Sequence, residues 1–469
     1  MTRIYIAFSS AGLFSSTQTY QLNYPKGRVL SNEELLHALH QRSNGIEFVG
    51  TTEPQKPWEA AAAIEDQTDR PDGLLYFGPL SPQLLAKDLP TIAVYPLWGR
   101  WQDGFHRYEG HRVVTATLPV IPDASEATFS SRLDAIAGKL KLIDAITRLK
   151  ALRILLITDR PVLGEYAPYP WQTEQEGREA YEQKYLDNLG ALGGEIVVRP
   201  QSEMVSRLRT VSDEAAAEVA AHWIAHAEEI KGTNKVQVRQ SAKLYLTMKA
   251  MLHEYEANAI TTEGYGVSMS YHDGPIPSQG LPSSMLCTEG VIATSETLVD
   301  SLITQQLGLW ITGSAGFNGD YIVDPENNKA YVGHCECPLN PYGDERRAPY
   351  VIRNLPQWPI DKQEIGGACV QVNLPEEEPV TVAKLSVHDK KMTMFSGRTV
   401  NGERLFPGWN EILCRTKVAI DVDAQRLFQH LDWITFDVHR VVFYGHHQQT
   451  FADLAKLLNY ELTVEDQRL

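Results

Sequence analysis

The sequence predicts an α/β protein with two doubly wound parallel-sheet domains, followed by a C-terminal antiparallel, β-barrel-like domain. Two observations support this fold class. Over the first 285 residues, short apolar runs alternate with helical patterns, as in parallel sheets covered by helices. After about residue 345, short alternating runs separated by turns take over, as in antiparallel sheets. The 469 residues are also enough for two or three domains.

The first domain is expected over residues 1–150. The runs "RIYIAF", "GLLYFG" and "TIAVYPL" have the composition of buried strands, and "NEELLHALHQ" has the spacing of a helix. The longer "TFSSRLDAIAGKLKLIDAITRL" repeats apolar residues three and four positions apart, which predicts the helix that closes the domain.

The middle domain is expected over residues 151–285 and begins with the strand "LRILLITDRPV". A helix is predicted in "SDEAAAEVAAHWIAHAEEIKG", with Ser212 as its cap and a stop at Gly232. A second helix, "VQVRQSAKLYLTMKAMLHEYEA", leads into the strand "NAITTEGYG". From about Ser268 to Pro282 the chain is rich in Gly, Pro and Ser, which predicts a loop between domains.

The C-terminal domain is expected over residues 286–469. Its β-barrel portion should start at about residue 345, because "ACVQVNL", "VTVAKLSV", "KMTMFSGRTV" and "CRTKVAIDV" read as short antiparallel strands.

Composition and charge narrow the function. A net charge of −16 without any Lys/Arg-rich run argues against nucleic acid as a partner and fits an enzyme. No stretch reaches 18 uninterrupted apolar residues, so no membrane span is expected. Five cysteines, an odd number, are typical of reduced thiols and predict a cytoplasmic protein.

Three polar residues at the edges of predicted elements are candidate metal ligands. In "EGVIATSETLVDSLITQQLG" a helix should begin after Thr294-Ser295, with Glu296 in its first turn, where free N–H groups favour an ionised carboxylate. Asp320 follows a Gly/Asn-rich turn in "WITGSAGFNGDYIVD", and His439 belongs to the apolar run of "ITFDVHRVVFYGHH". Each has an ordinary alternative: a first-turn acid, a turn aspartate or a structural histidine. Two carboxylates and one imidazole together suit Mn²⁺ or Mg²⁺.

These segments resemble the L-fucose isomerase and L-arabinose isomerase superfamily. The resemblance lies in "TSE" at 294–296, an Asp 24 residues later (320 − 296 = 24), "DYIVDPENNKAYVGHCECP" and "HRVVFYGHHQQTFADLAKLL". It runs from about residue 150 to the C-terminus and is weaker in the first domain. The resemblance implies that Glu296, Asp320 and His439 bind a divalent cation, with Asp437 a candidate to orient the His439 imidazole or else a surface acid.

The resemblance also implies an aldose–ketose isomerase that moves a proton between C1 and C2 of an open-chain sugar through a cis-enediol. Glu296 and Asp320 would then be ligands and acid–base groups together. Four further residues are expected to bind substrate: His334, Arg415, Trp98 and His446. A homo-oligomer is implied, with a neighbouring subunit completing the site.

The chain departs from some relatives near the metal ligand. Ser295 stands where they carry Cys, and Leu298 stands where they carry an acid. These differences leave the substrate open. Two alternatives remain beside the isomerase: a metal-dependent enzyme that breaks or transfers a carbon–carbon bond of a sugar, and a non-catalytic sugar-binding protein.

Overall fold

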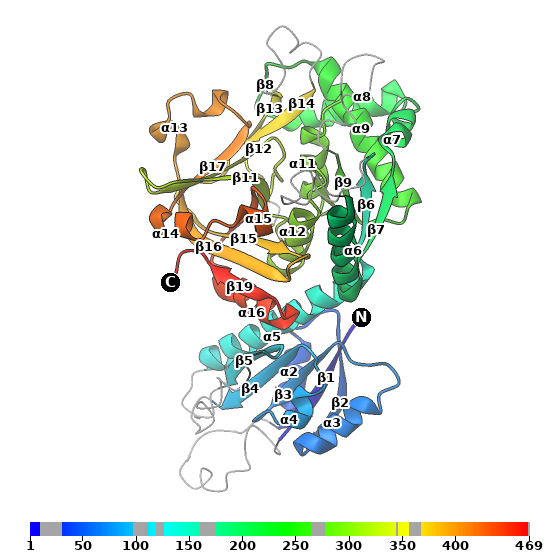
Figure 1. Ribbon diagram of the computed structural model, residues 1–469, viewed down its shortest axis with the longest axis vertical. Helices are drawn as coiled ribbons and strands as arrows, with labels where there is room; N and C mark the ends of the chain where they lie inside the picture. Colours follow the sequence, from blue (N-terminus) through cyan, green and yellow to red (C-terminus); the bar gives the residue numbers. More distant parts are fainter. Residues whose placement is uncertain are drawn as a thin grey trace. The chain divides into compact units, whose positions relative to one another are not determined.

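The computed structural model describes residues 1–9, 31–96, 108, 110–118, 126–159, 175–263, 277–343, 346–355 and 367–467 (Figure 1). Its contacts divide the chain into two compact units. One comprises residues 1–148 with 449–461, and the other comprises 149–448 with 462–469. None of the helices in the described ranges is long and apolar enough to cross a lipid bilayer.

The first unit is built on a five-stranded parallel sheet in the order β2-β1-β3-β4-β5. Its strands are β1 (Thr2–Phe8), β2 (Ile46–Pro54), β3 (Gly73–Phe77), β4 (Thr91–Pro96) and β5 (Val113–Leu118). The helices between and after them are α2 (Asn32–His40), α3 (Pro57–Glu65), α4 (Pro82–Leu85) and α5 (Glu126–Arg148). The strand–helix alternation expected for this part of the chain is confirmed.

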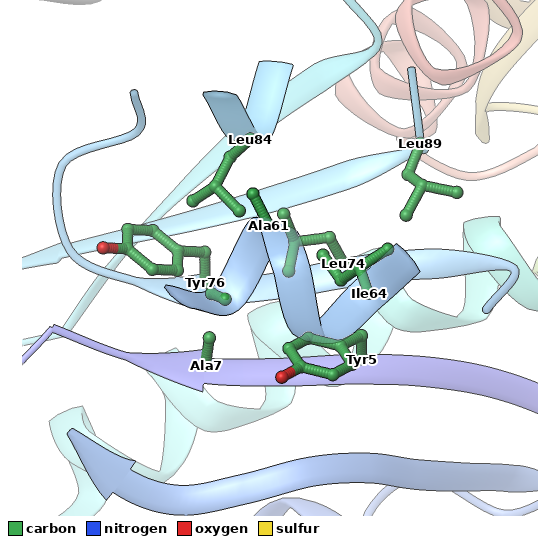
Figure 2. Close-up of a cluster of buried hydrophobic side chains, with 9 residues drawn as sticks. Tyr5, Ala7, Ala61, Ile64, Leu74, Tyr76, Leu84 and Leu89 are labelled. Carbon is green, nitrogen blue, oxygen red and sulfur yellow. The ribbon is translucent and has the colours of Figure 1, made fainter. Parts of the chain in front are cut away.

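Buried side chains join the sheet of the first unit to the helices on one of its faces (Figure 2). Tyr5 and Leu74 of the sheet pack in one cluster with Ile64 of α3 and Leu84 of α4. Nearly every residue of β1 and β3 is buried, as in strands that helices cover on both faces, and this explains why these runs are almost wholly apolar. The unit also takes in the C-terminal helix α16 (Gln448–Leu458), where Asp453 pairs with Lys139 of α5.

The second unit contains a four-stranded parallel sheet in the order β10-β9-β6-β7. Its strands are β6 (Arg153–Ile157), β7 (Glu195–Arg199), β9 (Ala259–Thr262) and β10 (Ile292–Thr294). Its helices are α6 (Gln175–Leu192), α7 (Gln201–Leu208), α8 (Asp213–His226), α9 (Lys235–Glu254), α11 (Gly280–Thr288) and α12 (Val299–Thr312). The boundary expected near residue 285 falls inside α11, and the edge strand β10 comes after it.

Two element ends differ from the sequence prediction. Ser212 caps α8 as expected, with its hydroxyl accepting from the Ala215 N–H, but the helix ends at His226 and not at Gly232. The reason is tertiary, because β8 (Ile230–Lys231) pairs with another strand, β13. The predicted interdomain loop also ends early, since residues 280–282 already belong to α11.

A closed barrel of six antiparallel strands forms the C-terminal part of the second unit, which confirms the predicted fold class. The strands follow the order β15-β18-β11-β12-β17-β16, and β16 pairs with β15 to close the ring. They are β11 (Phe317–Asp324), β12 (Lys329–His334), β15 (Pro379–Ser386), β16 (Lys391–Val400), β17 (Thr416–Asp421) and β18 (His439–Tyr444). A short strand, β19 (Glu461–Val464), adds to β16.

The barrel begins earlier than the expected position near residue 345, because β11 and β12 precede that point. The strand that contains "ACVQV", β14 (Ala368–Val372), lies outside the barrel in a small sheet with β13 (Tyr350–Asn354) and β8. Helix α12 packs against the barrel strand β18 through Gly308. A Cβ atom there would lie 2.1 Å from a ring carbon of Phe443, so this close approach requires glycine.

Candidate metal centre

Three barrel strands bring Asp320, His334 and His439 to one place. Asp320 of β11 is the register partner of His439 at the start of β18. On its other side Asp320 is opposite Gly333 of β12, and His334 is the next residue and the last of that strand. Antiparallel pairing therefore fixes the relative positions of two ligands predicted from the sequence and adds a second imidazole.

Glu296 reaches the same place from the parallel sheet, after β10. The prediction that it lies in the first turn of a helix is wrong, because α12 begins only at Val299. Glu296 and Thr297 both have left-handed backbone conformations, with φ of 63° and 54°. The Thr297 N–H donates to the carbonyl of Thr262 at the end of β9, at 2.8 Å, which keeps the chain out of the helix.

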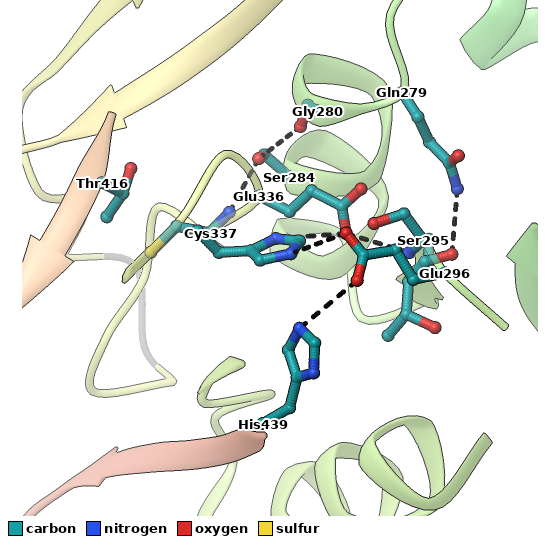
Figure 3. Close-up of polar contacts among 12 residues, drawn as sticks. Gln279, Gly280, Ser284, Ser295, Glu296, Glu336, Cys337, Thr416 and His439 are labelled. Carbon is teal, nitrogen blue, oxygen red and sulfur yellow. Dashed lines mark hydrogen bonds and ion pairs between the residues drawn. The ribbon is translucent and has the colours of Figure 1, made fainter. Parts of the chain in front are cut away.

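The carboxylate of Glu296 and the ring of His439 point toward one another (Figure 3). The Nε2 atom of His439 lies 3.6 Å from Oε2 of Glu296 and 3.6 Å from Oδ1 of Asp320. The Nε2 atom of His334 lies 3.7 Å from Oε1 of Glu296. One ligand atom from each of Glu296, His334 and His439 lies within 4.8 Å of the other two. These three residues could therefore hold one metal ion.

The donor types fit such an ion. Carboxylate oxygens and imidazole nitrogens are ligands of first-row divalent cations. His439 is fully buried, whereas the Asp320 side chain is 47% exposed, so the centre is dry on one side and open to solvent on the other. Within the described ranges this is the one group of three or more His, Cys, Asp and Glu residues with such geometry.

Neighbouring charges set the protonation states of the centre. Burial alone would raise the pKa of Glu296, but contact with His334 and the charge of His439 outweigh burial, so the pKa lies below its ordinary value. Burial would lower the pKa of His334, but Glu296 and Glu336 raise it to about 10. The two residues thus form an ion pair near neutral pH. A metal ion would replace the proton that His334 carries.

Asp437 is placed to orient His439, the role proposed for it from the sequence. Its Oδ1 atom accepts from the His439 backbone N–H at 2.5 Å and lies 3.5 Å from Nδ1 of the ring. Lys384, which is fully buried, donates to Oδ2 of Asp437 at 3.0 Å. Burial would raise the pKa of Asp437, but Lys384 and His439 overcome it and hold the pKa well below its ordinary value. No pattern in the sequence pointed to Lys384, because it is a single lysine within an apolar strand and belongs to no motif.

The other residues expected to bind substrate lie elsewhere or outside the described residues. The buried guanidinium of Arg415 donates to the Asn354 carbonyl at 3.0 Å and to the Glu411 carbonyl at 3.2 Å. His446 is exposed in the turn after β18. Trp98 lies outside the described residues. His334, expected to bind substrate, instead lies among the candidate metal ligands.

All five cysteines are free thiols, as expected from their odd number. Three of them, Cys335, Cys369 and Cys414, pack together beside His334. Contact with Cys335, and then burial, raise the pKa of Cys414 far above its ordinary value, so its thiol is held protonated.

No protein-family model matches the chain, and no curated protein sequence is significantly similar to it.

Proposed function

We propose that the protein is a metal-dependent aldose–ketose isomerase of the L-fucose and L-arabinose isomerase type, acting on an open-chain sugar. One observation carries this proposal. Two carboxylates, Glu296 and Asp320, approach the same nitrogen of His439 from different parts of the fold, each at 3.6 Å. The Asp320 side chain is 47% exposed, so a small polar substrate could reach this carboxylate from solvent.

In this proposal Glu296, His334, His439 and Asp320 hold the cation. The two imidazoles favour Mn²⁺ over Mg²⁺, because imidazole nitrogen suits transition metals whereas Mg²⁺ prefers oxygen. When bound, the cation supplies Lewis-acid polarisation of a sugar carbonyl and its neighbouring hydroxyl group.

The two carboxylates have different roles in this proposal. The Glu296 side chain is only 18% exposed and remains ionised beside two imidazoles, which suits a permanent ligand. Asp320 is on the open side, so we assign it the proton transfer. It takes the proton from one of the two carbons C1 and C2 and returns it to the other, while a hydroxyl proton moves to the former carbonyl oxygen. The intermediate is a cis-enediol, and no other reactant is consumed.

The first experiment is metal analysis of the protein after purification and after chelator treatment followed by manganese. We expect about one Mn²⁺ per chain. The Glu296→Gln variant should lose it. The matched control is Glu289→Gln, seven residues earlier, where the carboxylate accepts from the Tyr245 hydroxyl and from the Lys249 ammonium group.

The second step is a screen of aldoses and ketoses with the manganese-loaded protein in D₂O, followed by NMR. An isomerase incorporates deuterium at C1 or C2 and yields the partner sugar. Shorter carbon chains among the products would contradict the isomerase and support carbon–carbon bond cleavage. Sugar binding that is equally tight in wild type and Glu296→Gln, without exchange in either, would instead indicate a non-catalytic binding protein.

A further inference from the structure

We infer that Glu336 is a positioning residue that holds two parts of the metal centre at once, the backbone before Glu296 and the imidazole of His334. The inference deepens the proposed function and rests on its metal centre, but it does not depend on the sugar chemistry. Glu336 does not belong to the group of ligand atoms that converge on the candidate metal position.

One oxygen atom of Glu336 is hydrogen-bonded to the first segment and lies near the second. Its Oε2 accepts from the Ser295 backbone N–H at 3.1 Å and lies 3.9 Å from Nδ1 of His334 (Figure 3). The opposite ring nitrogen of His334, Nε2, lies 3.7 Å from Glu296. At 3.9 Å the carboxylate makes no hydrogen bond to Nδ1, but its negative charge on the far side of the imidazole favours a proton on Nδ1 and leaves Nε2 to bind the metal.

The backbone contact matters because the next two residues are strained. Glu296 and Thr297 both have positive φ, and Thr297 is β-branched, so this conformation is unfavourable for both. Such a pair persists only when the surroundings hold it. Glu336 binds the N–H of Ser295 just before the pair, and the Thr262 carbonyl binds the N–H of Thr297 within it. Together these bonds determine where the Glu296 carboxylate lies.

Glu336 is itself firmly placed. The next residue, Cys337, donates its N–H to the hydroxyl of Ser284 at 2.9 Å, and Leu339 donates to Thr288 at 2.8 Å. Both hydroxyls lie on α11 and bond back to carbonyls four residues earlier, so each is fixed in turn. The segment that carries Glu336 is thus attached to the helix that precedes β10. The Glu336 side chain is only 11% exposed, so water competes little for its contacts.

The test is the Mn²⁺ affinity of the full chain after chelator treatment, measured by electron paramagnetic resonance of the free ion. We expect Glu336→Ala to weaken binding about 10–100-fold, the usual cost of removing an outer partner of a metal ligand. Glu336→Gln should fall between Glu336→Ala and wild type, since its amide oxygen can still accept from Ser295. The spectrum of bound Mn²⁺ should also change in both variants, because the ligand geometry changes.

Glu289→Gln serves as the control and should keep wild-type affinity and spectrum. Unchanged affinity in Glu336→Ala would overturn the inference and leave the metal centre intact. Equal losses of Mn²⁺ affinity in the two Glu336 variants would overturn the role assigned to the hydrogen bond with Ser295. If Glu336→Ala does not fold, Glu336→Gln decides alone, and wild-type affinity there overturns the inference. A wild-type protein that binds no Mn²⁺ overturns both this inference and the proposed metal centre.

Discussion

The two sides of the metal centre are built in different ways. Asp320, His334 and His439 lie in barrel strands, where ladder hydrogen bonds fix each residue against its neighbour. Glu296 lies between a strand and a helix, in a left-handed segment held by bonds from Glu336 and Thr262. The barrel side is therefore preformed by regular pairing, whereas the Glu296 side depends on a few specific contacts. Substitutions on the two sides should have different consequences.

The largest effect should come from removing a buried ligand on the barrel side. His439→Ala should weaken Mn²⁺ affinity by more than about 100-fold, because it removes a metal ligand itself. Removing a residue that only orients a ligand costs up to about that much. Asp320→Asn should retain more affinity, since Asp320 is half exposed, but should lower turnover by about 10²–10⁴-fold, the usual contribution of acid–base catalysis. Metal titration and exchange kinetics measure the two effects separately. Equal loss of affinity in both variants would contradict this division of roles.

A second large effect should come from the buried cation behind His439. Lys384 is fully buried and bonds to Asp437 and to Ser301 of α12. Lys384→Met leaves the Asp437 carboxylate, only 20% exposed, without its cation, and we expect a loss of about 3–5 kcal/mol in the free energy of unfolding of the metal-free protein.

Urea unfolding tests the Lys384 prediction. The double variant Lys384→Met/Asp437→Asn should recover part of the loss, because no unpaired charge remains. Lys391→Met, at the start of the neighbouring strand β16, should change stability by only about 0.5 kcal/mol or less. A Lys384→Met protein as stable as this control would show that the ion pair contributes nothing to the barrel side.

A medium, pH-dependent effect is expected at Asp300 in the first turn of α12. Burial raises its pKa to about 6 despite Lys384 and the hydroxyl of Tyr185, which oppose the shift. The folded-state pKa lies above the ordinary 3.8, so the protonated form stabilises the fold at low pH, and this contribution is lost as the pH rises through about 6. The free energy of unfolding of Asp300→Asn should therefore rise relative to that of wild type by about 1–3 kcal/mol between about pH 4 and about pH 7.

Urea unfolding of both proteins across that pH range measures the difference. The amide can still accept from the Tyr185 hydroxyl and the Val387 N–H, so the contacts are matched. A stability difference between variant and wild type that does not change with pH would show that Asp300 does not titrate in this range.

The smallest effect should come from relieving the backbone strain on the Glu296 side. Thr297→Gly should raise the free energy of unfolding of the metal-free protein by about 1 kcal/mol, because glycine adopts positive φ without penalty. The control is Asn328→Gly in the turn between β11 and β12, at φ 53°. Asparagine tolerates this conformation, so Asn328→Gly should raise the free energy of unfolding by less than Thr297→Gly does. A loss of stability in Thr297→Gly would show that the Thr297 side chain outweighs the strain.

Much of the fold could be predicted from the sequence alone. The strands β1, β3 and β6 are short apolar runs, and α8 carries a Ser cap, so local patterns were sufficient. Element ends set by distant contacts were not predictable. The early end of α8 depends on pairing with β13, and the place of α16 in the first unit depends on packing with α5.

The sequence by itself determined the chemistry available to the site, because Glu296, Asp320 and His439 are ligand-type residues at the edges of predicted elements. Only the tertiary structure decided the geometry. It brought the three residues together, added His334 to them, placed Lys384 behind Asp437 and put Glu336 between two ligand segments. The physical reason is that periodicity and capping depend on neighbours in the chain. Strand register and buried charge pairing depend on segments tens of residues away, which no local pattern specifies.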